Sequence, residues 1–383
     1  MTSATLIEPD LDFIARVNSG AGLNLKKCYQ CATCSVACSI SHDDRPFPRK
    51  EMIYASWGLP DRLIANPDIW LCYNCGDCSD RCPRDARPGD VLGTLRKMAI
   101  REYSKPAVFH SLLDDPRKLP WLFIIPAVII FGMGVITGLM NLNPGGERIV
   151  FAHFFPVALI ELIFIPLSVA VGLVFFLGVR RFLADMRATH ERLGKGDPGP
   201  LDLKRFLQIL VRELPGIIRH DRFTTCSDNK HRKMSHIMVA FSFTSLAFVA
   251  GAFVFALYIL NSHGPYDQLN PVKILANISG IALIAGSLLL IRERRVALRQ
   301  TNGWFDWYLL GLALFLGLTG MLTQWLRLAG IPWAAYAMYF VHLLFAFNLI
   351  AFLPYTKLAH LVYRTVAVAY HHYAVDILGR KKV

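Results

Sequence analysis

The feature that most constrains this chain is a set of six apolar stretches, all of which follow Pro120. At a rise of about 1.5 Å per residue, each is long enough as a helix to cross a hydrocarbon core of about 30 Å. The composition agrees, because 54% of the 383 residues are hydrophobic and only 18% are charged. The predicted spans lie near Trp121–Met140, Val150–Val179, His236–Leu260, Ile274–Ile291, Phe305–Leu326 and Ala335–Tyr355. The sequence therefore predicts a mainly α-helical chain, with a six-helix transmembrane bundle after a soluble N-terminal region.

The distribution of basic residues predicts the orientation of these spans. The segment Met1–Phe13 is polar and acidic, unlike a secretory signal, so we expect the N-terminal region to stay in the cytoplasm. The three inner segments then carry 13, four and five Lys or Arg residues, whereas each outer loop carries one. The positive-inside rule places both termini on the cytoplasmic side of the inner membrane. It also accounts for the formal charge of +13, so we expect no nucleic-acid partner.

Eight of the nine cysteines form two runs with the same spacing, C-x2-C-x2-C-x3-C. This spacing is typical of bacterial ferredoxins with two [4Fe–4S] clusters, in which the fourth cysteine of each run binds the other cluster. Zinc sites usually separate two C-x2-C pairs by a longer loop, and a reducing cytoplasm disfavours disulfides. The predicted ligands are Cys28, Cys31, Cys34 and Cys82 for one cluster, and Cys72, Cys75, Cys78 and Cys38 for the other.

Two details distinguish this region from the smallest ferredoxins. The second run is followed by Pro83, whereas Ser39 follows the first run, which therefore lacks the usual closing proline. The segment between the runs is long, and its centre, Glu51–Ile64, has a pattern closer to helix than to strand. We therefore expect a mostly helical ferredoxin-like domain over residues 1–118. The ninth cysteine, Cys226, lies alone in a polar loop and is expected to be a free thiol.

Four histidines lie at or near predicted span ends, where ionisable side chains usually mark function. His342 and His360 are 18 residues apart, or five helical turns, and are predicted to share one face of the last helix about 27 Å apart. The predicted depth of each histidine in the membrane suggests two pairs. His153 and His342 both lie towards the outer side, and His236 and His360 both lie towards the inner side. Paired imidazoles from two helices hold haem without covalent attachment, so we expect two haem b groups. The alternative for each histidine is a capping or interfacial role.

The remaining polar features are assigned more simply. The inner loop 180–235 contains Leu201–Arg219, whose apolar residues recur near helical spacing, which favours an interfacial amphipathic helix or a docking surface. Residues 119–360 form the expected dihaem cytochrome b domain, and the tail 361–383 is expected to extend the last helix towards a cytoplasmic partner. The histidines predicted to be surface or non-ligating residues are His42, His110, His190, His220, His231, His263, His371 and His372.

A quinone site has no dependable sequence signature, but one outer loop combines suitable groups. The segment Asn261–Lys273 contains His263, Tyr266, Asp267 and Lys273 close to the expected outer haem. These side chains supply a donor to a quinone carbonyl and an acceptor for released protons. We therefore mark His263, Tyr266 and Lys273 as a candidate quinone site. The alternative is a simple polar hairpin between two spans.

Both parts of the chain resemble known electron-transfer proteins. The cysteine-rich domain is similar to the iron–sulfur subunit of heterodisulfide reductases. The spans, with His342 and His360, look like the cytochrome b subunits of heterodisulfide and respiratory nitrate reductases. Their fusion resembles the C subunits of the quinone-interacting membrane-bound oxidoreductase (Qmo) complexes of sulfate reducers. Two features depart from these families. Ser39 replaces the usual proline, and six spans are predicted where nitrate reductase cytochromes have five. Because the spans do not correspond one to one, the outer partner of His342 is assigned only from its predicted depth in the membrane.

The resemblance implies oxidation of menaquinol, with electrons passing through haems and clusters to two flavin-bearing, heterodisulfide-reductase-like iron–sulfur subunits. It also implies adenylylsulfate reductase as a downstream partner in sulfate respiration. Two other classes of function stay open. One is a membrane anchor and electron wire without its own quinone site, and the other is a redox sensor with labile clusters, for which no output motif is recognisable.

Overall fold

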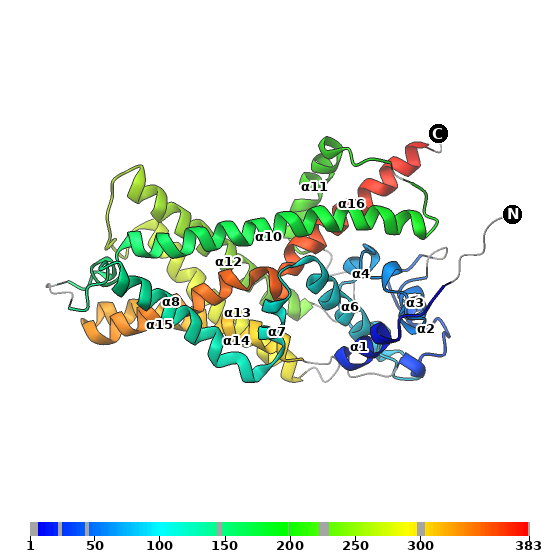
Figure 1. Cartoon of the computed structure of the whole chain (residues 1–383), viewed down its shortest axis with the longest axis horizontal. Coiled ribbons are helices and arrows are strands. Elements are labelled where there is room, and N and C mark those ends of the chain that lie inside the picture. Colours follow the sequence, from blue (N-terminus) through cyan, green and yellow to red (C-terminus); the bar gives the residue numbers. More distant parts are fainter. Residues whose placement is uncertain are drawn as a thin grey trace.

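The computed structural model describes residues 7–21, 25–42, 46–143, 148–197, 199–221, 230–296 and 303–381. Short helices form a cysteine-bearing half at one end, and long helices form the other half (Figure 1). Within the described ranges, six helices are long and apolar enough to cross a membrane. The predicted fold class is confirmed, because a mainly helical chain carries its cysteine region before six long apolar helices. Cys226 and the side chain of His231 lie outside the described residues.

The cysteine-bearing half contains a structural repeat that follows the sequence repeat. Equivalent positions of the two runs are 44 residues apart, and the short helices α2 (Thr33–Val36) and α5 (Asp77–Asp80) obey the same offset. Each begins after a residue with left-handed φ, Ala32 at 67° and Gly76 at 96°, so the chain turns tightly within each run. The other elements that precede α8 are η1 (Leu25–Lys27), η2 (Pro60–Arg62), η3 (Pro116–Lys118), α1 (Leu11–Ala21), α3 (Arg49–Ser56), α4 (Asp68–Leu71), α6 (Pro88–Tyr103) and α7 (Val108–Asp114), of which α7 and η3 pack against the long helices.

Each long helix overlaps one predicted span. The long helices are α8 (Leu119–Ile136), α10 (Val157–Arg192), α12 (Lys230–Tyr258), α13 (Pro271–Val296), α14 (Trp304–Leu328) and α15 (Pro332–Ala351). The 36-residue α10 is about 54 Å long, so it reaches well beyond a bilayer core and runs alongside the cysteine-bearing half (Figure 1). The shorter elements are α9 (Phe151–Phe154), α11 (Leu203–Ile218), η5 (Leu353–Tyr355), η6 (Lys357–Ala359) and α16 (His360–Lys381).

His342 and His360 do not share one helix, so the prediction from helical phase is wrong. α15 ends before the two turns η5 and η6, and α16 begins at His360. Pro354 lies in this break and has no N–H with which to continue the helical hydrogen bonds. The Ser104 hydroxyl from the other half donates to the Pro354 carbonyl oxygen at 2.7 Å, which fixes the break against the cysteine-bearing half.

The second span also begins later than predicted. Its helix, α10, starts at Val157 because Pro156 precedes it. Phe155 has an extended backbone (φ −116°, ψ 94°), as residues before proline usually do. His153 therefore lies in the separate short helix α9 instead of starting the span, and its side chain is exposed.

Aromatic side chains join the two halves into one core. The ring of Phe182, from the extension of α10, lies 6.2 Å from that of Trp70, 4.9 Å from that of Tyr103 and 5.6 Å from that of Tyr363. All four side chains are at most 3% exposed. The tail after His360 therefore packs on the chain's own cysteine-bearing half.

Two histidines predicted to lie at the surface are enclosed by the same packing. His190 is 7% exposed, and its ring lies 6.2 Å from that of Tyr370 on α16. His371 is partly buried, and burial lowers its pKa to about 4. Both predictions failed because the C-terminal end of α10 continues as a helix and packs against α16, where the sequence suggested an open loop.

A buried carboxylate connects the cysteine-bearing half with the segment after α10. Asp68 Oδ2 lies 2.6 Å from Lys50 Nζ and 2.9 Å from Lys195 Nζ, and all three side chains are mostly buried. Burial alone would raise the pKa of Asp68, but the Lys195 and Lys50 ammonium groups outweigh it and hold the pKa well below its ordinary value. This contribution to stability is therefore present above about pH 4 and is lost as the pH falls further.

We predict that Asp68→Asn destabilises the chain by about 3 kcal/mol, because two buried ammonium groups lose the carboxylate between them. The thermal unfolding midpoint of the full-length protein in detergent measures the effect. Asp61→Asn is the matched control, since the pair of Asp61 with Arg192 joins the same two segments at 3.9 Å but is more than half exposed. Removing this exposed ion pair should change the thermal unfolding midpoint little. Equal midpoints for the two variants would contradict this role of Asp68.

Candidate functional site

The first three cysteines of the first run lie beside the last cysteine of the second. Cys28 and Cys31 come from the loop that leads into α2, and Cys34 lies in that helix. Burial raises the pKa of Cys28, and the nearby charges of Cys82 and Cys31 also raise it. Burial, followed by the charges of Cys28 and Cys82, raises the pKa of Cys34 to about 11. Such effects require proximity, so the fold brings Cys82 to the first run.

The complementary four cysteines form a second group. Cys38, Cys72, Cys75 and Cys78 line one pocket, together with other residues of the second run. Cys72 and Cys78 are buried. Burial raises the pKa of Cys78, and the charges of Cys72, Cys75 and Cys38 add to the increase. Four thiols this close together, two of them buried, need bound cations to stay deprotonated, and iron at each sulfur would supply them.

Backbone amides face the sulfur atoms in both groups. The Asn74 N–H donates to Cys72 Sγ and the Ala86 N–H donates to Cys82 Sγ, each at 3.3 Å. Hydrogen bonds to cluster sulfurs are one of the factors that set a cluster's reduction potential. Asn74 lies within the second run and Ala86 lies four residues after it, so this run and the segment that follows it supply both ligands and polar surroundings.

Three histidines gather at the end of the spans that meets the cysteine-bearing half. The ring centroids of His236 and His360, which we call the inner histidine pair, are 6.3 Å apart with ring planes at 79°. Two imidazoles that share one metal through bonds of about 2 Å place their centroids about 6 Å apart, so the spacing suits a shared iron. His220, which the sequence placed at the surface, lies with Nε2 2.8 Å from His236 Nδ1.

The surroundings of His360 also suit a ligand. Its Nδ1 bonds to the carbonyl oxygen of Lys357, which orients Nε2 as the metal-binding nitrogen. Burial lowers the pKa of His360 to about 4, so the imidazole is neutral at pH 7, which is the form that binds a metal. His236 lies inside α12, nearly two turns from its start, instead of beginning the helix.

A loop of the second cysteine group contacts the two helices that carry the inner histidine pair. The loop between Cys72 and Cys75 consists of Tyr73 and Asn74. Arg232 donates to the Asn74 carbonyl oxygen at 2.8 Å, and the guanidinium of Arg364 lies 5.7 Å from the centre of the Tyr73 ring. Each arginine is one helical turn away from a member of the inner histidine pair. The two candidate cofactor sites are thus joined through two side chains.

The outer pair predicted from depth is not in contact. His342 packs against α14, where Thr319 Oγ1 is 3.0 Å from His342 Nδ1. If Gly320 carried a side chain, its Cβ atom would lie only 3.0 Å from His342 Cε1. Glycine at position 320 therefore makes room for the imidazole. The side chain of His153 is exposed in α9, while its neighbours Phe151 and Phe154 face α15.

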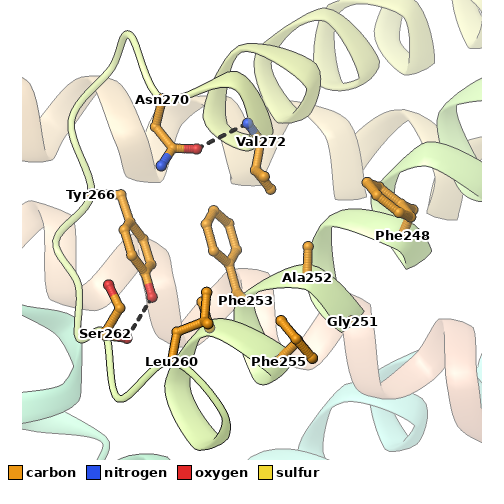
Figure 2. Close-up of a pocket in the computed structure, with 11 residues that line it drawn as sticks. Phe248, Gly251, Ala252, Phe253, Phe255, Leu260, Ser262, Tyr266, Asn270 and Val272 are labelled. Atoms are coloured by element: carbon orange, nitrogen blue, oxygen red, sulfur yellow. Dashed lines mark hydrogen bonds between the residues drawn. The ribbon is translucent and has the colours of Figure 1, made fainter.

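A pocket of about 610 Å³ opens at the C-terminal end of α12, and Figure 2 shows its lining. The rings of Phe253 and Tyr266 stack with centroids 4.7 Å apart, and the Tyr266 hydroxyl donates to the Ser262 carbonyl oxygen. Of the three residues marked for a quinone, Tyr266 lines this pocket. His263 is exposed and Lys273 is partly buried, and neither is among the lining residues.

The sequence reasoning missed a group of amides between two spans. Gln324 Nε2 donates to Gln268 Oε1 at 3.0 Å and to Asn277 Oδ1 at 2.8 Å. Polar side chains at membrane depth usually have a function, and this rule was applied only to the histidines. The same rule applied to Asn277 and Gln324, which lie inside predicted spans, would have found the group.

Comparison with known proteins identifies the N-terminal region. Residues 24–86 match the family model of the 4Fe-4S dicluster domain. This region of the chain is a 4Fe–4S dicluster domain. Its eight cysteines provide for two clusters, and six candidate membrane helices follow it.

The chain is also similar to curated subunits of heterodisulfide reductases. The C subunit of the H2:CoB–CoM heterodisulfide,ferredoxin reductase of Methanothermobacter marburgensis is 33% identical over 93 residues, 24% of this chain and 50% of that protein. The C2 subunit of the H2/formate:CoB–CoM heterodisulfide,ferredoxin reductase of Methanococcus maripaludis is 35% identical over 104 residues, 27% of this chain and 52% of that protein. The chain spans about half the length of these relatives. No solved structure matches.

Proposed function

We propose that this chain passes electrons between menaquinol and cytoplasmic flavoprotein partners through two b haems and two [4Fe–4S] clusters. The contact of the Tyr73–Asn74 loop with Arg232 and Arg364 carries this proposal. It sets the second cysteine group beside the inner histidine pair, so a membrane cofactor and a cytoplasmic cluster would be neighbours. The dicluster domain supports electron transfer independently.

Each cofactor has a proposed set of ligands in this chain. When bound, clusters and haems supply one-electron carriers, while the chain keeps imidazoles neutral and oriented. We propose His236 and His360 as the ligands of the inner haem. For the outer haem we propose His342, with His153 as its partner because the two are predicted to lie at the same depth in the membrane. The cluster ligands remain Cys28, Cys31, Cys34 and Cys82 for one cluster, and Cys72, Cys75, Cys78 and Cys38 for the other.

The proposed partners come from the relatives and from the order of the two halves. Relatives of the dicluster domain are subunits of heterodisulfide reductase complexes, so we propose two heterodisulfide-reductase-like flavoprotein iron–sulfur subunits as partners. Fusion with membrane helices resembles the Qmo complexes, which adds adenylylsulfate reductase as the acceptor further downstream. An anchor and electron wire without its own quinone site is the second candidate function.

We place the quinone at the pocket beside Tyr266. The pocket is largely apolar, and its stacked Phe253 and Tyr266 rings suit a flat quinone ring. Oxidation of one quinol releases two electrons and two protons. At the outer end of α12 the protons would leave on the outer side, while the electrons would move inward towards the dicluster domain.

The test is reduction of the haems by a water-soluble menaquinol analogue, followed by stopped-flow absorbance in membranes that lack the partner proteins. We expect rapid reduction in the unmodified protein and a rate about tenfold lower in Tyr266→Ala, a loss of about 1.4 kcal/mol of binding. Tyr266→Phe should stay near the original rate, because it keeps the stacking ring. Tyr258→Ala is the matched control, since Tyr258 also lies at the outer end of α12 but is 60% exposed and outside the pocket.

The contrary outcomes are distinct. No haem reduction by the analogue in the unmodified protein would favour the anchor and wire. Reduction at an unchanged rate in both Tyr266→Ala and Phe253→Ala would keep the quinol dehydrogenase function but move its site away from this pocket.

A further inference from the structure

Helix α11 (Leu203–Ile218) carries more apolar surface than its packing covers. One side, with Phe206 and Ile209 buried, packs on α16. A second apolar stripe is open, and its large side chains are 46–71% exposed. The members of this apolar stripe are Leu203, Leu207, Val211 and Ile218. They recur at helical spacing, so they form one continuous strip along the helix.

Basic side chains border the apolar stripe on the side away from α16. At about 100° per residue, Lys204, Arg212 and Arg219 fall in one sector beyond the stripe. All three residues are exposed. The helix therefore presents three sectors in order, which are a packed face, an open apolar stripe and a basic edge. Helices that lie in the interface of a bilayer have this order of apolar and basic sectors.

The position of α11 agrees with such an interface. Figure 1 shows α11 crossing the direction of α10, near the place where the long helices meet the cysteine-bearing half. Beyond its C-terminal end, His220 bonds to His236, which lies near the inner end of a candidate span. At its other end, Arg205 makes a two-fold ion pair with Asp376 on α16 at 3.0 and 3.2 Å. Both ends are held, so the helix is fixed across the direction of the spans.

We propose that α11 lies in the cytoplasmic surface of the membrane, with its apolar stripe in the acyl-chain boundary and its basic edge on anionic phospholipid headgroups. Lipid is favoured over a protein partner because the helix lies at the depth where the spans end and because its exposed edge is positively charged. The cytoplasmic leaflet provides negative charge at that depth. A soluble partner or a second copy of the chain is the outcome that would count against lipid.

The test compares two adjacent exposed positions on different sectors. Leu207→Cys and Gln208→Cys are made separately in a Cys226→Ser background, where the other cysteines belong to the clusters, and are labelled with an environment-sensitive fluorophore. The full-length protein is reconstituted into vesicles of phosphatidylethanolamine and phosphatidylglycerol, with or without brominated acyl chains. We expect bromine to quench the label at position 207 about twofold more than at position 208, because apolar faces of such helices sit about 5–10 Å deep.

Several results would overturn the proposal. Equal quenching at the two positions would show that the stripe is not in lipid. An unquenched label at position 207 that self-quenches as the protein-to-lipid ratio rises would assign the stripe to a second copy. For the basic edge, Lys204→Glu with Arg212→Glu should reduce quenching at position 207, and unchanged quenching would rule out the anionic headgroups. Retained cluster absorbance confirms that each variant is folded.

Discussion

Cys82→Ser is expected to remove one [4Fe–4S] cluster and to lower acid-labile sulfide from about eight to about four per chain, because each cubane carries four sulfides. Sulfide is the suitable measure, since haem iron does not contribute to it. The loss should fall on the cluster of the first run, because the charge on Cys82 acts on Cys28 and Cys34 across the fold.

Double variants show which cysteines share a cluster. If Cys82 belongs with the first run, Cys31→Ser added to Cys82→Ser costs no further sulfide, and about four remain. Cys75→Ser added to Cys82→Ser instead removes both clusters and leaves almost none. Uncrossed ligation predicts the reverse pattern, with complete loss when Cys31 and Cys82 are changed together. Cys38→Ser gives the mirror test for the second run.

The cysteine-bearing half was accessible from the sequence because short-range spacing carries most of its information. Two identical runs predicted two clusters, and the general rule for two-cluster domains predicted the crossing of Cys38 and Cys82. The apolar stretches predicted the six long helices for a similar reason, since length and composition decide whether a helix can span a membrane. Neither inference needed knowledge of distant contacts.

The histidine arrangement was less accessible, because two prolines and one long-range contact decide it. Pro354 lies in the break of the helix that was predicted to connect His342 with His360, and Pro156 separates His153 from the second span. Both prolines stand in the sequence, but their effect on the helices was underestimated. The position of His220 was not predictable, because it depends on α11 folding back to α12.

Loss of a haem is the second large effect that we expect. His236→Ala and His360→Ala should each abolish the same low-spin haem signal, since their rings lie at the spacing of two ligands on one iron. His342→Ala should abolish the other signal and leave the first intact. Optical and electron paramagnetic resonance spectra of the reduced and oxidised full-length protein separate the two haems.

His371→Ala is the matched control for the inner haem. His371 also belongs to α16, and it follows His360 by 11 residues, or three helical turns, so it lies on the same face of the same helix. It lies close to Asp68 and Lys195 instead of the inner histidine pair. Its replacement should leave both haem signals unchanged. Loss of a haem in His371→Ala as well as in His360→Ala would mean that disturbing α16 is sufficient, and the assignment of His360 would fail.

His220→Ala separates orientation from ligation within the same group. His220 contacts His236 Nδ1, so removal of the His220 imidazole should shift the midpoint potential of the inner haem without abolishing its signal, as the loss of a supporting hydrogen bond does.

The variant His153→Ala tests the proposed ligands of the outer haem. The exposed His153 is the partner that depth assigns to His342, and loss of the same signal in His153→Ala and His342→Ala would require α9 to turn inward when haem binds. If His153→Ala instead keeps both signals, His342 takes its second ligand from another residue, and the depth argument holds only for the inner haem.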